Sequence, residues 1–368
     1  MQPFPNCLPL VLRPLLVAGL FASTGLATTR SAAVERIAYQ APGGQPKEVV
    51  AKALVTAQDG GQMVVTDDGQ MLIIQPEWIL TRSSDAEPLV PVDANEAGRR
   101  LLAEMSPGFA IYRTKNYVIV HNTHDGHVRW VGGLFESLHL GFHRFFKNQG
   151  WDLSAPEYPL VALVFADRAS FEAYARPELG DMAAAVIGYY NLETNRMTTF
   201  NVPNAERNVA TIIHEATHQL AYNTGLQTRF ADNPMWVSEG LAMFFEAPNF
   251  NNPSGWRGIG RVNSVKLNDF RLYARNRPGD SLATLLSDDS RFRNNATARD
   301  AYAEAWALTY YLLKTRKKSY IQYLRALSED KPLVERNRRE RIDMFERIFE
   351  VDLATLDRDF INYMGKVR

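Results

Sequence analysis

The sequence predicts an α+β protein in which a small β-rich module precedes a larger domain made of a mixed sheet and a helical half. Short apolar or alternating runs, separated by Gly, Asp and Asn, occur from residue 34 to about residue 202, as is typical of strands and hairpins. From residue 205 onward, apolar residues recur mostly every three or four positions, which indicates helices. The chain has 368 residues, enough for one large and one small domain.

Residues 1–33 are expected to be an export signal. An apolar core at 15–21 is followed by small residues at 22–27, which predicts cleavage after Ala27 or near Ala33. The core is too short to span a bilayer comfortably, so no stable membrane anchor is expected after cleavage. We therefore expect a secreted or periplasmic protein. Cys7, the single cysteine, would leave with the signal, so the mature chain would contain no disulfide.

The charge balance excludes one class of partner. The chain carries 41 basic and 41 acidic residues, for a formal net charge of zero. Proteins that bind nucleic acid or anionic membranes usually carry a clear basic excess. No nucleic-acid partner is therefore expected.

The segment 34–92 is expected to form the β-rich module. Residues 48–57 alternate between apolar and polar, and turn signals at 60–61 and 67–69 separate the apolar runs 63–65 and 71–74. It contains no chemically suggestive cluster. It is either a binding or docking module, or a flank that packs on the domain at 96–368.

The remaining elements follow from local patterns. Before the central motif we expect the following in order: a helix at 96–105, a hairpin at 109–120, an amphipathic helix at 128–147, a strand at 160–165, a helix at 168–175 and a hairpin made of 184–190 and 196–202. Residues 247–298 are expected to be mostly loop. A strong helix at 299–318 and further amphipathic helices then complete the chain.

Two groups of histidines lie ahead of the central motif. His121, His124 and His127 could bind a metal, but Asp125 and Gly126 would interrupt a helix there, so a polar loop or a helix entry is expected. The pair at 139 and 143 lies four residues apart on a predicted helix without an acid–base partner, which favours a structural role.

The chemistry is concentrated in a His-Glu-x-x-His motif at residues 214–218. Asn204 caps a predicted helix that ends before Gly225, so His214 and His218 lie on one face and can reach a single ion. Glu215 would point toward water near that ion. A catalytic zinc needs three protein ligands and an open position, and it lowers the pKa of water to about 7. The motif therefore predicts a Zn²⁺ site in which Glu215 is the general base.

The third ligand has two candidates. Glu239 lies in a mostly apolar helix, where a carboxylate is costly unless it is paired or bound to a metal. Asp232 precedes Asn233-Pro234 and is more typical of a cap for that helix. Glu239 is the preferred ligand, and Gly240 beside it would let this helix approach the His-bearing helix closely.

These motifs resemble those of the gluzincin metallopeptidases, which include thermolysin-like enzymes and the M1 aminopeptidases. The resemblance consists of the motif at 214–218 followed by Trp-x-x-Glu-Gly-x-Ala at 236–242. Gln219 and Asn223 extend it toward the aminopeptidase version. Glu246 lies two turns after Glu239 and either orients a ligand or is an ordinary surface residue. The whole chain is similar to an uncharacterised group of secreted bacterial gluzincins.

The resemblance implies a fold and a mechanism. A gluzincin-like domain would place a sheet edge beside the active-site helix, here either 197–201 or 185–190, unless these are internal strands. Thermolysin-like enzymes stabilise the oxyanion with a late His, but no His follows His218. The aminopeptidase-like alternative implies Tyr302, with Tyr310 and Tyr273 as fallbacks. The Gly-x-Met-Glu-Asn motif of aminopeptidases is absent.

The expected function is that of a secreted zinc metallopeptidase that acts on a peptide or protein substrate. Two rivals remain open at this stage. One is a non-catalytic cell-surface binding protein with a structural zinc site. The other is a hydrolase of cell-wall amides, which the sequence does not distinguish from a peptidase.

Overall fold

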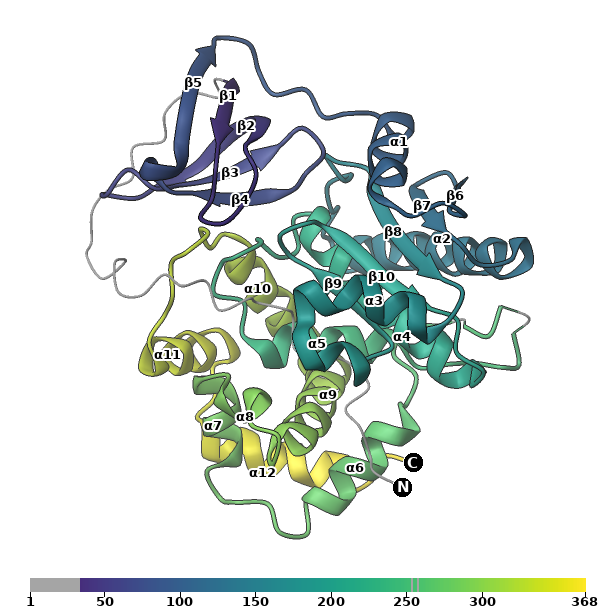
Figure 1. The fold of residues 1–368 in the computed structure, drawn as a ribbon. Coiled ribbons are helices and arrows are strands. Elements are labelled where there is room, and N and C mark those ends of the chain that lie inside the picture. The colour runs from purple at the N-terminus through teal and green to yellow at the C-terminus, as the bar shows by residue number, and fades with distance from the viewer. Residues whose placement is uncertain (1–33, 253, 257) are drawn as a thin grey trace.

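Two five-stranded sheets and twelve α-helices make up the described part of the computed structural model, residues 34–252, 254–256 and 258–368 (Figure 1). The α+β class expected from the sequence is therefore confirmed. The export signal expected at 1–33 lies outside the described residues. Within the described ranges, no helix is both long and apolar enough to cross a membrane.

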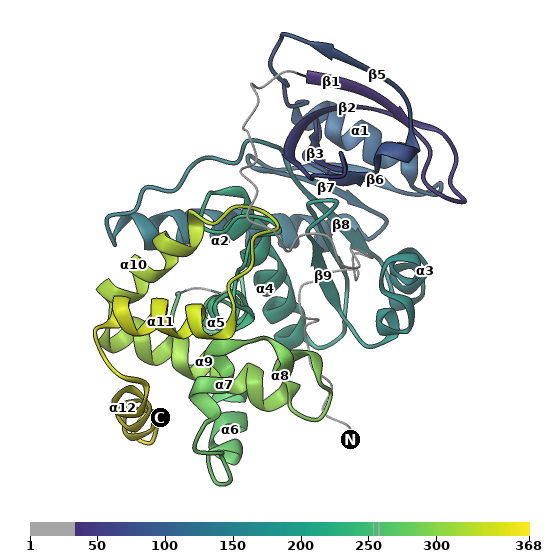
Figure 2. The same cartoon turned by 90° about the vertical axis from the view of Figure 1, so that its left-hand side faces the viewer.

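The first sheet contains the strands expected in the N-terminal module. Every neighbouring pair is antiparallel, in the order β4-β3-β2-β1-β5. Alternating residues supply a small core of its own around Ile37, Val64 and Ile74. The sheet lies at the top of the molecule in Figures 1 and 2. Its strands are β1 (Val34–Tyr39), β2 (Lys47–Thr56), β3 (Gln62–Thr66), β4 (Met71–Ile74) and β5 (Ile79–Asp85).

The second sheet is mixed, as the sequence predicts. Its order is β6-β7-β8-β10-β9, with β8 parallel to both β7 and β10 and with antiparallel pairs at both edges. The edge strand is thus the one predicted near 185–190, whereas the one near 197–201 is internal. The strands are β6 (Ala110–Arg113), β7 (Tyr117–His121), β8 (Leu160–Phe165), β9 (Gly188–Asn191) and β10 (Arg196–Phe200).

Both faces of the second sheet are covered by helices. Successive strand residues point to opposite faces, so Ile119 and Ala162 join one core while Val118 and Val161 join another. The first core includes α2 and α4, and the second includes α1 and α3. Their bounds are α1 (Ala94–Glu104), α2 (Asp125–Lys147), α3 (Arg168–Leu179) and α4 (Ala205–Asn223).

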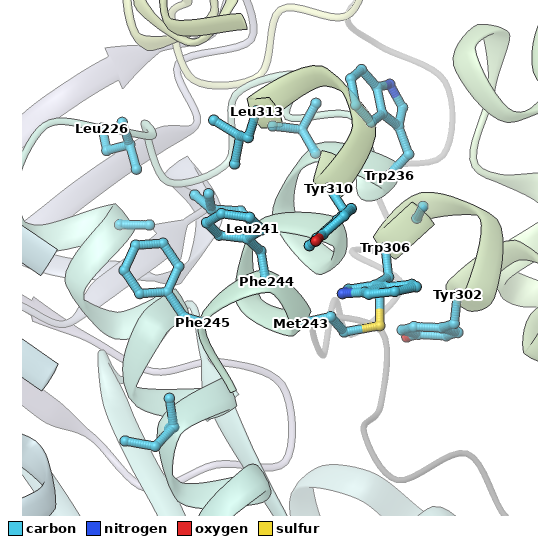
Figure 3. Close-up of a cluster of buried hydrophobic side chains, with 14 of the residues drawn as sticks. Leu226, Trp236, Leu241, Met243, Phe244, Phe245, Tyr302, Trp306, Tyr310 and Leu313 are labelled. Carbon is cyan, nitrogen blue, oxygen red and sulfur yellow. The ribbon is translucent and has the colours of Figure 1, made fainter. Parts of the chain in front are cut away.

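The helical half is built around α9, which packs against α5 and α6. Figure 3 shows aromatic and aliphatic side chains from α5 and α9 that meet in the buried core. The helix predicted at 299–318 is divided at Arg316 into α9 and α10. The bounds are α5 (Met235–Phe245), α6 (Ser264–Tyr273), α7 (Ser281–Ser287), α8 (Ser290–Arg293), α9 (Ala298–Thr315), α10 (Lys317–Ser328), α11 (Arg338–Phe349) and α12 (Leu353–Met364).

Residues 247–298 are loop-rich as expected, but three short helices among them were not predicted. Helices α6, α7 and α8 lie there. These helices are short, and most of their residues are not buried. A helical repeat of apolar residues is therefore hard to detect in them. Their burial depends on α9 and α11, which come later in the chain.

Gly240 permits a close helix contact, but not the one expected. A Cβ atom on Gly240 would lie 2.2 Å from Thr309 Oγ1 and 2.7 Å from the Ala305 carbonyl oxygen. Both neighbours belong to α9, so the predicted close approach to α4 at this glycine was wrong. Consecutive residues of a helix point about 100° apart, so Gly240 faces α9 while Glu239 faces α4.

Candidate metal centre

Helix α4 forms as the sequence predicts and presents both histidines on one face. The Asn204 side chain accepts a hydrogen bond from the Arg207 N–H at the first turn. The helix ends at Asn223, and Gly225 follows with φ +76° in the left-handed region that glycine tolerates. His214 and His218, one turn apart, are both buried.

The three predicted ligands converge on one point. His214 Nε2 lies 3.1 Å from His218 Nε2 and 3.2 Å from Glu239 Oε2. His218 Nε2 lies 3.7 Å from Glu239 Oε1. Ligand atoms about 2.0–2.2 Å from a tetrahedral zinc lie roughly 3.3–3.5 Å apart, so the spacing suits such an ion. Among the described residues, this is the group of three His, Cys, Asp or Glu side chains that could hold a metal.

The charge of Glu239 also suits a cation. Glu239 is fully buried on α5, and its Oε1 has no hydrogen-bond partner among the described residues. Burial by itself raises the pKa of this carboxyl group, but His218 and His214 outweigh that effect and lower the pKa to about 2. An ionised carboxylate and two imidazole nitrogens thus face one another in a buried space, which is the donor chemistry that zinc prefers.

Glu246 fixes the orientation of His214. Glu246 Oε2 lies 2.6 Å from His214 Nδ1, and Glu246 Oε1 accepts a 2.7 Å hydrogen bond from Asn263 Nδ2. A proton on Nδ1 leaves the lone pair of Nε2 directed at the cluster. Glu246 is only 6% exposed, so of its two predicted roles the ordinary surface residue is excluded. Asn263, which also caps α6, was not foreseen because no local pattern links it to the motif.

Glu215 lies between the cluster and the edge of the sheet. Burial raises the pKa of its carboxyl group, and His214 and His218 partly offset this effect. The backbone of Tyr190 in the edge strand β9 offsets it further. Glu215 Oε1 has no hydrogen bond among the described residues. This oxygen is therefore left for another proton donor.

Tyr302 lies on the first turns of α9, the helix that packs against α5. Its ring meets the Phe292 ring edge-on at 5.3 Å, and it appears beside Met243 and Trp306 in Figure 3. Its role as the oxyanion donor remains a prediction. The two fallback tyrosines have other surroundings, since Tyr273 bonds Ser281 and Arg291 while Tyr310 packs against Trp306.

Asp232, the alternative ligand, lies outside the cluster. Both of its carboxylate oxygens bond the Arg341 guanidinium. Its predicted role as a helix cap was also wrong, because the Met235 N–H at the start of α5 donates to Asp289 Oδ1 instead. That cap comes from a residue far along the chain, which no local pattern reveals.

The other histidines take structural positions. His124 caps α2 by accepting a hydrogen bond from the His127 N–H, so the helix entry is confirmed. Asp125 and Gly126 begin the helix, and the expectation that they interrupt it was wrong. On α2 the rings of the pair at 139 and 143 lie 4.6 Å apart.

Gln219 and Asn223, which extend the resemblance, attach α4 to the sheet. Gln219 Nε2 donates to the carbonyl oxygens of Val161 and Asn195 at 2.8 and 3.0 Å. Asn223 and Asn195 exchange a pair of side-chain hydrogen bonds at 2.7 and 2.9 Å. These contacts fix the position of α4 relative to β8 and the β9–β10 hairpin.

One family model matches part of the chain. Residues 208–334 match the model of a family described as a protein of unknown function (DUF1570). The matched segment contains the three clustered donors together with Glu215, Glu246 and Tyr302. A search of curated proteins finds no match to the chain.

Proposed function

We propose that this chain is an exported zinc-dependent peptidase in which His214, His218 and Glu239 hold the metal. The observation that carries the proposal is the convergence of two Nε2 atoms and a buried, ionised carboxylate at 3.1–3.7 Å. Glu215 follows the first histidine, and one of its oxygens is without a hydrogen bond among the described residues. Zinc, when bound, is a Lewis acid that lowers the pKa of water and polarises a carbonyl group.

The protein groups supply the remaining steps of amide hydrolysis. Glu215 accepts a proton from the attacking water and delivers it to the leaving amine. The Glu246 carboxylate holds the His214 ring in place through Nδ1. The N–H and C=O groups of the edge strand β9 suit an extended peptide, which can add to the sheet as a further strand. Tyr302 would donate to the oxyanion that forms at the substrate carbonyl.

The test uses the purified protein, loaded with zinc, and an unbiased peptide library read by mass spectrometry. The wild-type protein is expected to cleave peptides, and Glu215→Gln is expected to retain zinc while losing about 10²–10⁴-fold in kcat, the usual share of a general base. Undiminished cleavage by Glu215→Gln would exclude the role given to this residue.

The same experiment separates the rival functions. Internal cuts that disappear in the Glu215→Gln control indicate an endopeptidase, whereas trimming from one end indicates an exopeptidase. A zinc-loaded protein that cuts no peptide is next given purified cell-wall peptidoglycan. Release of soluble fragments would change the substrate to a cell-wall amide. No release would favour a binding protein with a structural zinc.

A further inference from the structure

One buried arginine, Arg229, connects the first sheet to the edge strand of the second sheet, which lies near the candidate active site. Arg229 lies in the segment between α4 and α5, hence between the second and third zinc donors, and is only 6% exposed. Its Nη1 donates to the Gly69 carbonyl oxygen at 2.9 Å and to the Leu192 carbonyl oxygen at 3.2 Å. Gly69 belongs to the turn between β3 and β4, and Leu192 follows the edge strand β9. One guanidinium therefore joins three separate parts of the chain.

The turn of the first sheet is fitted closely against the larger domain. Gly69 has φ +83°, and a Cβ atom there would lie 2.7 Å from Cγ of Tyr158. Two residues later, the Met71 N–H donates to the Glu193 carbonyl oxygen at 2.7 Å. The loop of the β9–β10 hairpin is therefore held at two successive carbonyls, that of Leu192 by Arg229 and that of Glu193 by Met71 of the first sheet.

The β9–β10 hairpin in turn packs against α4, the helix that carries Glu215. The Tyr190 ring stacks on Tyr222 of α4, and the Tyr190 hydroxyl donates to Asn195 Oδ1 at 2.7 Å. The Tyr190 backbone also lowers the pKa of the Glu215 carboxyl group. Residue 190 is thus two positions from the carbonyl that Arg229 holds, in the strand that packs on the helix of the predicted general base.

We propose that Arg229 is a positioning residue that ties the β9–β10 hairpin to the first sheet and so fixes the backbone beside Glu215. The inference rests on the proposed peptidase function. A buried guanidinium bonded to carbonyl oxygens is a poor source of stability, because its desolvation is costly. Its value here is geometric, since the two N–H bonds of Nη1 are fixed in the guanidinium plane and hold two carbonyls in a set arrangement. The first sheet then acts as part of the active-site scaffold rather than as a separate binding module.

The test compares Arg229→Met with Arg100→Met in the full chain. Arg100 also joins the first sheet to the larger domain, through a two-bond contact with Asp67 at 2.8 and 3.1 Å, but it does not touch the hairpin. Both variants are assayed with zinc well below their unfolding temperatures. Arg229→Met is expected to keep its zinc and lose about 10–100-fold in kcat, as misplaced catalytic groups do. Arg100→Met is expected to keep the wild-type kcat.

Two further readouts distinguish positioning from general weakening. Hydrogen exchange of residues 188–195 is expected to accelerate in Arg229→Met and to stay at the wild-type rate in Arg100→Met. Arg229→Lys, which retains donors but not the planar guanidinium, is expected to recover part of the loss. The proposal is overturned if Arg229→Met keeps both wild-type kcat and wild-type exchange, or if Arg100→Met shows the same losses. A wild-type protein without peptidase activity would refute the proposed function, and the exchange data would still decide the anchoring.

Discussion

Two fully buried glutamates, Glu239 and Glu304, show how differently one fold can treat the same side chain. Glu304 on α9 has both oxygens engaged: Oε1 accepts from Arg277, and Oε2 accepts from Ser281 and pairs with Arg291. Glu239 on α5 faces two histidines, and one of its oxygens has no hydrogen bond among the described residues. The first site is complete in the protein alone. The second has the composition and spacing of a site that a cation completes.

The largest stability effect is expected at the completed site. Glu304→Gln removes the carboxylate that pairs with the Arg291 guanidinium, whose side chain is only 12% exposed, and loss of one partner from a buried pair costs about 3–5 kcal/mol. The free energy of unfolding, measured with urea, should fall by this amount and equally with and without zinc. Asp343→Asn removes an exposed partner of Arg339 and serves as the control, with a change of about 0.5 kcal/mol or less. If Glu304→Gln lost a different amount of unfolding free energy with zinc than without it, Glu304 would not be a site that is complete without a cation.

For Glu239, in contrast, the effect of substitution on stability should depend on zinc. Zinc at 1,000 times its dissociation constant is expected to stabilise the wild-type protein by about 4 kcal/mol through mass action. Glu239→Gln should lose most of this gain because it lacks the anionic donor. Urea unfolding with zinc and with a chelator measures both quantities. Equal zinc stabilisation of wild type and Glu239→Gln would rule out Glu239 as a ligand.

A smaller effect on zinc affinity is expected at Glu246, which would orient a metal ligand, than at Glu239, which would bind the metal. Glu246→Gln keeps the size of the side chain but weakens the 2.6 Å contact with His214 Nδ1. Zinc affinity is expected to fall about 10–100-fold, as is usual when the partner of a metal-bound histidine is changed. Competition with a chromophoric chelator measures the affinity. Asn263→Asp, which leaves an oxygen facing Glu246 where a donor stood, should lower it as well, and an unchanged affinity in both variants would exclude the orienting role.

The sequence predicted the parts of the site that are local in the chain. The cap at Asn204, the buried stripe of α4 and the spacing of His214 and His218 are short-range features, and all of them appear in the structure. The position of Glu239 beside the two histidines and the contact of Glu246 with His214 followed from a second local motif.

The features that were missed or assigned wrongly depend on residues far apart. Asp289 caps α5 although two helices intervene in the sequence. The missing side chain of Gly240 lets α5 pack closely against α9, not against α4. Helices α6 to α8 are short, so their periodicity is weak, and they are stabilised by later helices. Long-range packing of this kind leaves no periodic signal in a single sequence.

The donors of the candidate centre lie close together along the chain, between His214 and Glu246. Loop-closure entropy grows with the length of the loop that must be closed, so bringing these groups together costs less than closing the contact between Arg229 and Gly69, which lie 160 residues apart. Contacts between near neighbours in sequence also form early in folding. The candidate metal centre is thus encoded within one short stretch of the chain, whereas the elements that pack around this stretch, from the first sheet to α9, come from both sides of it in the sequence.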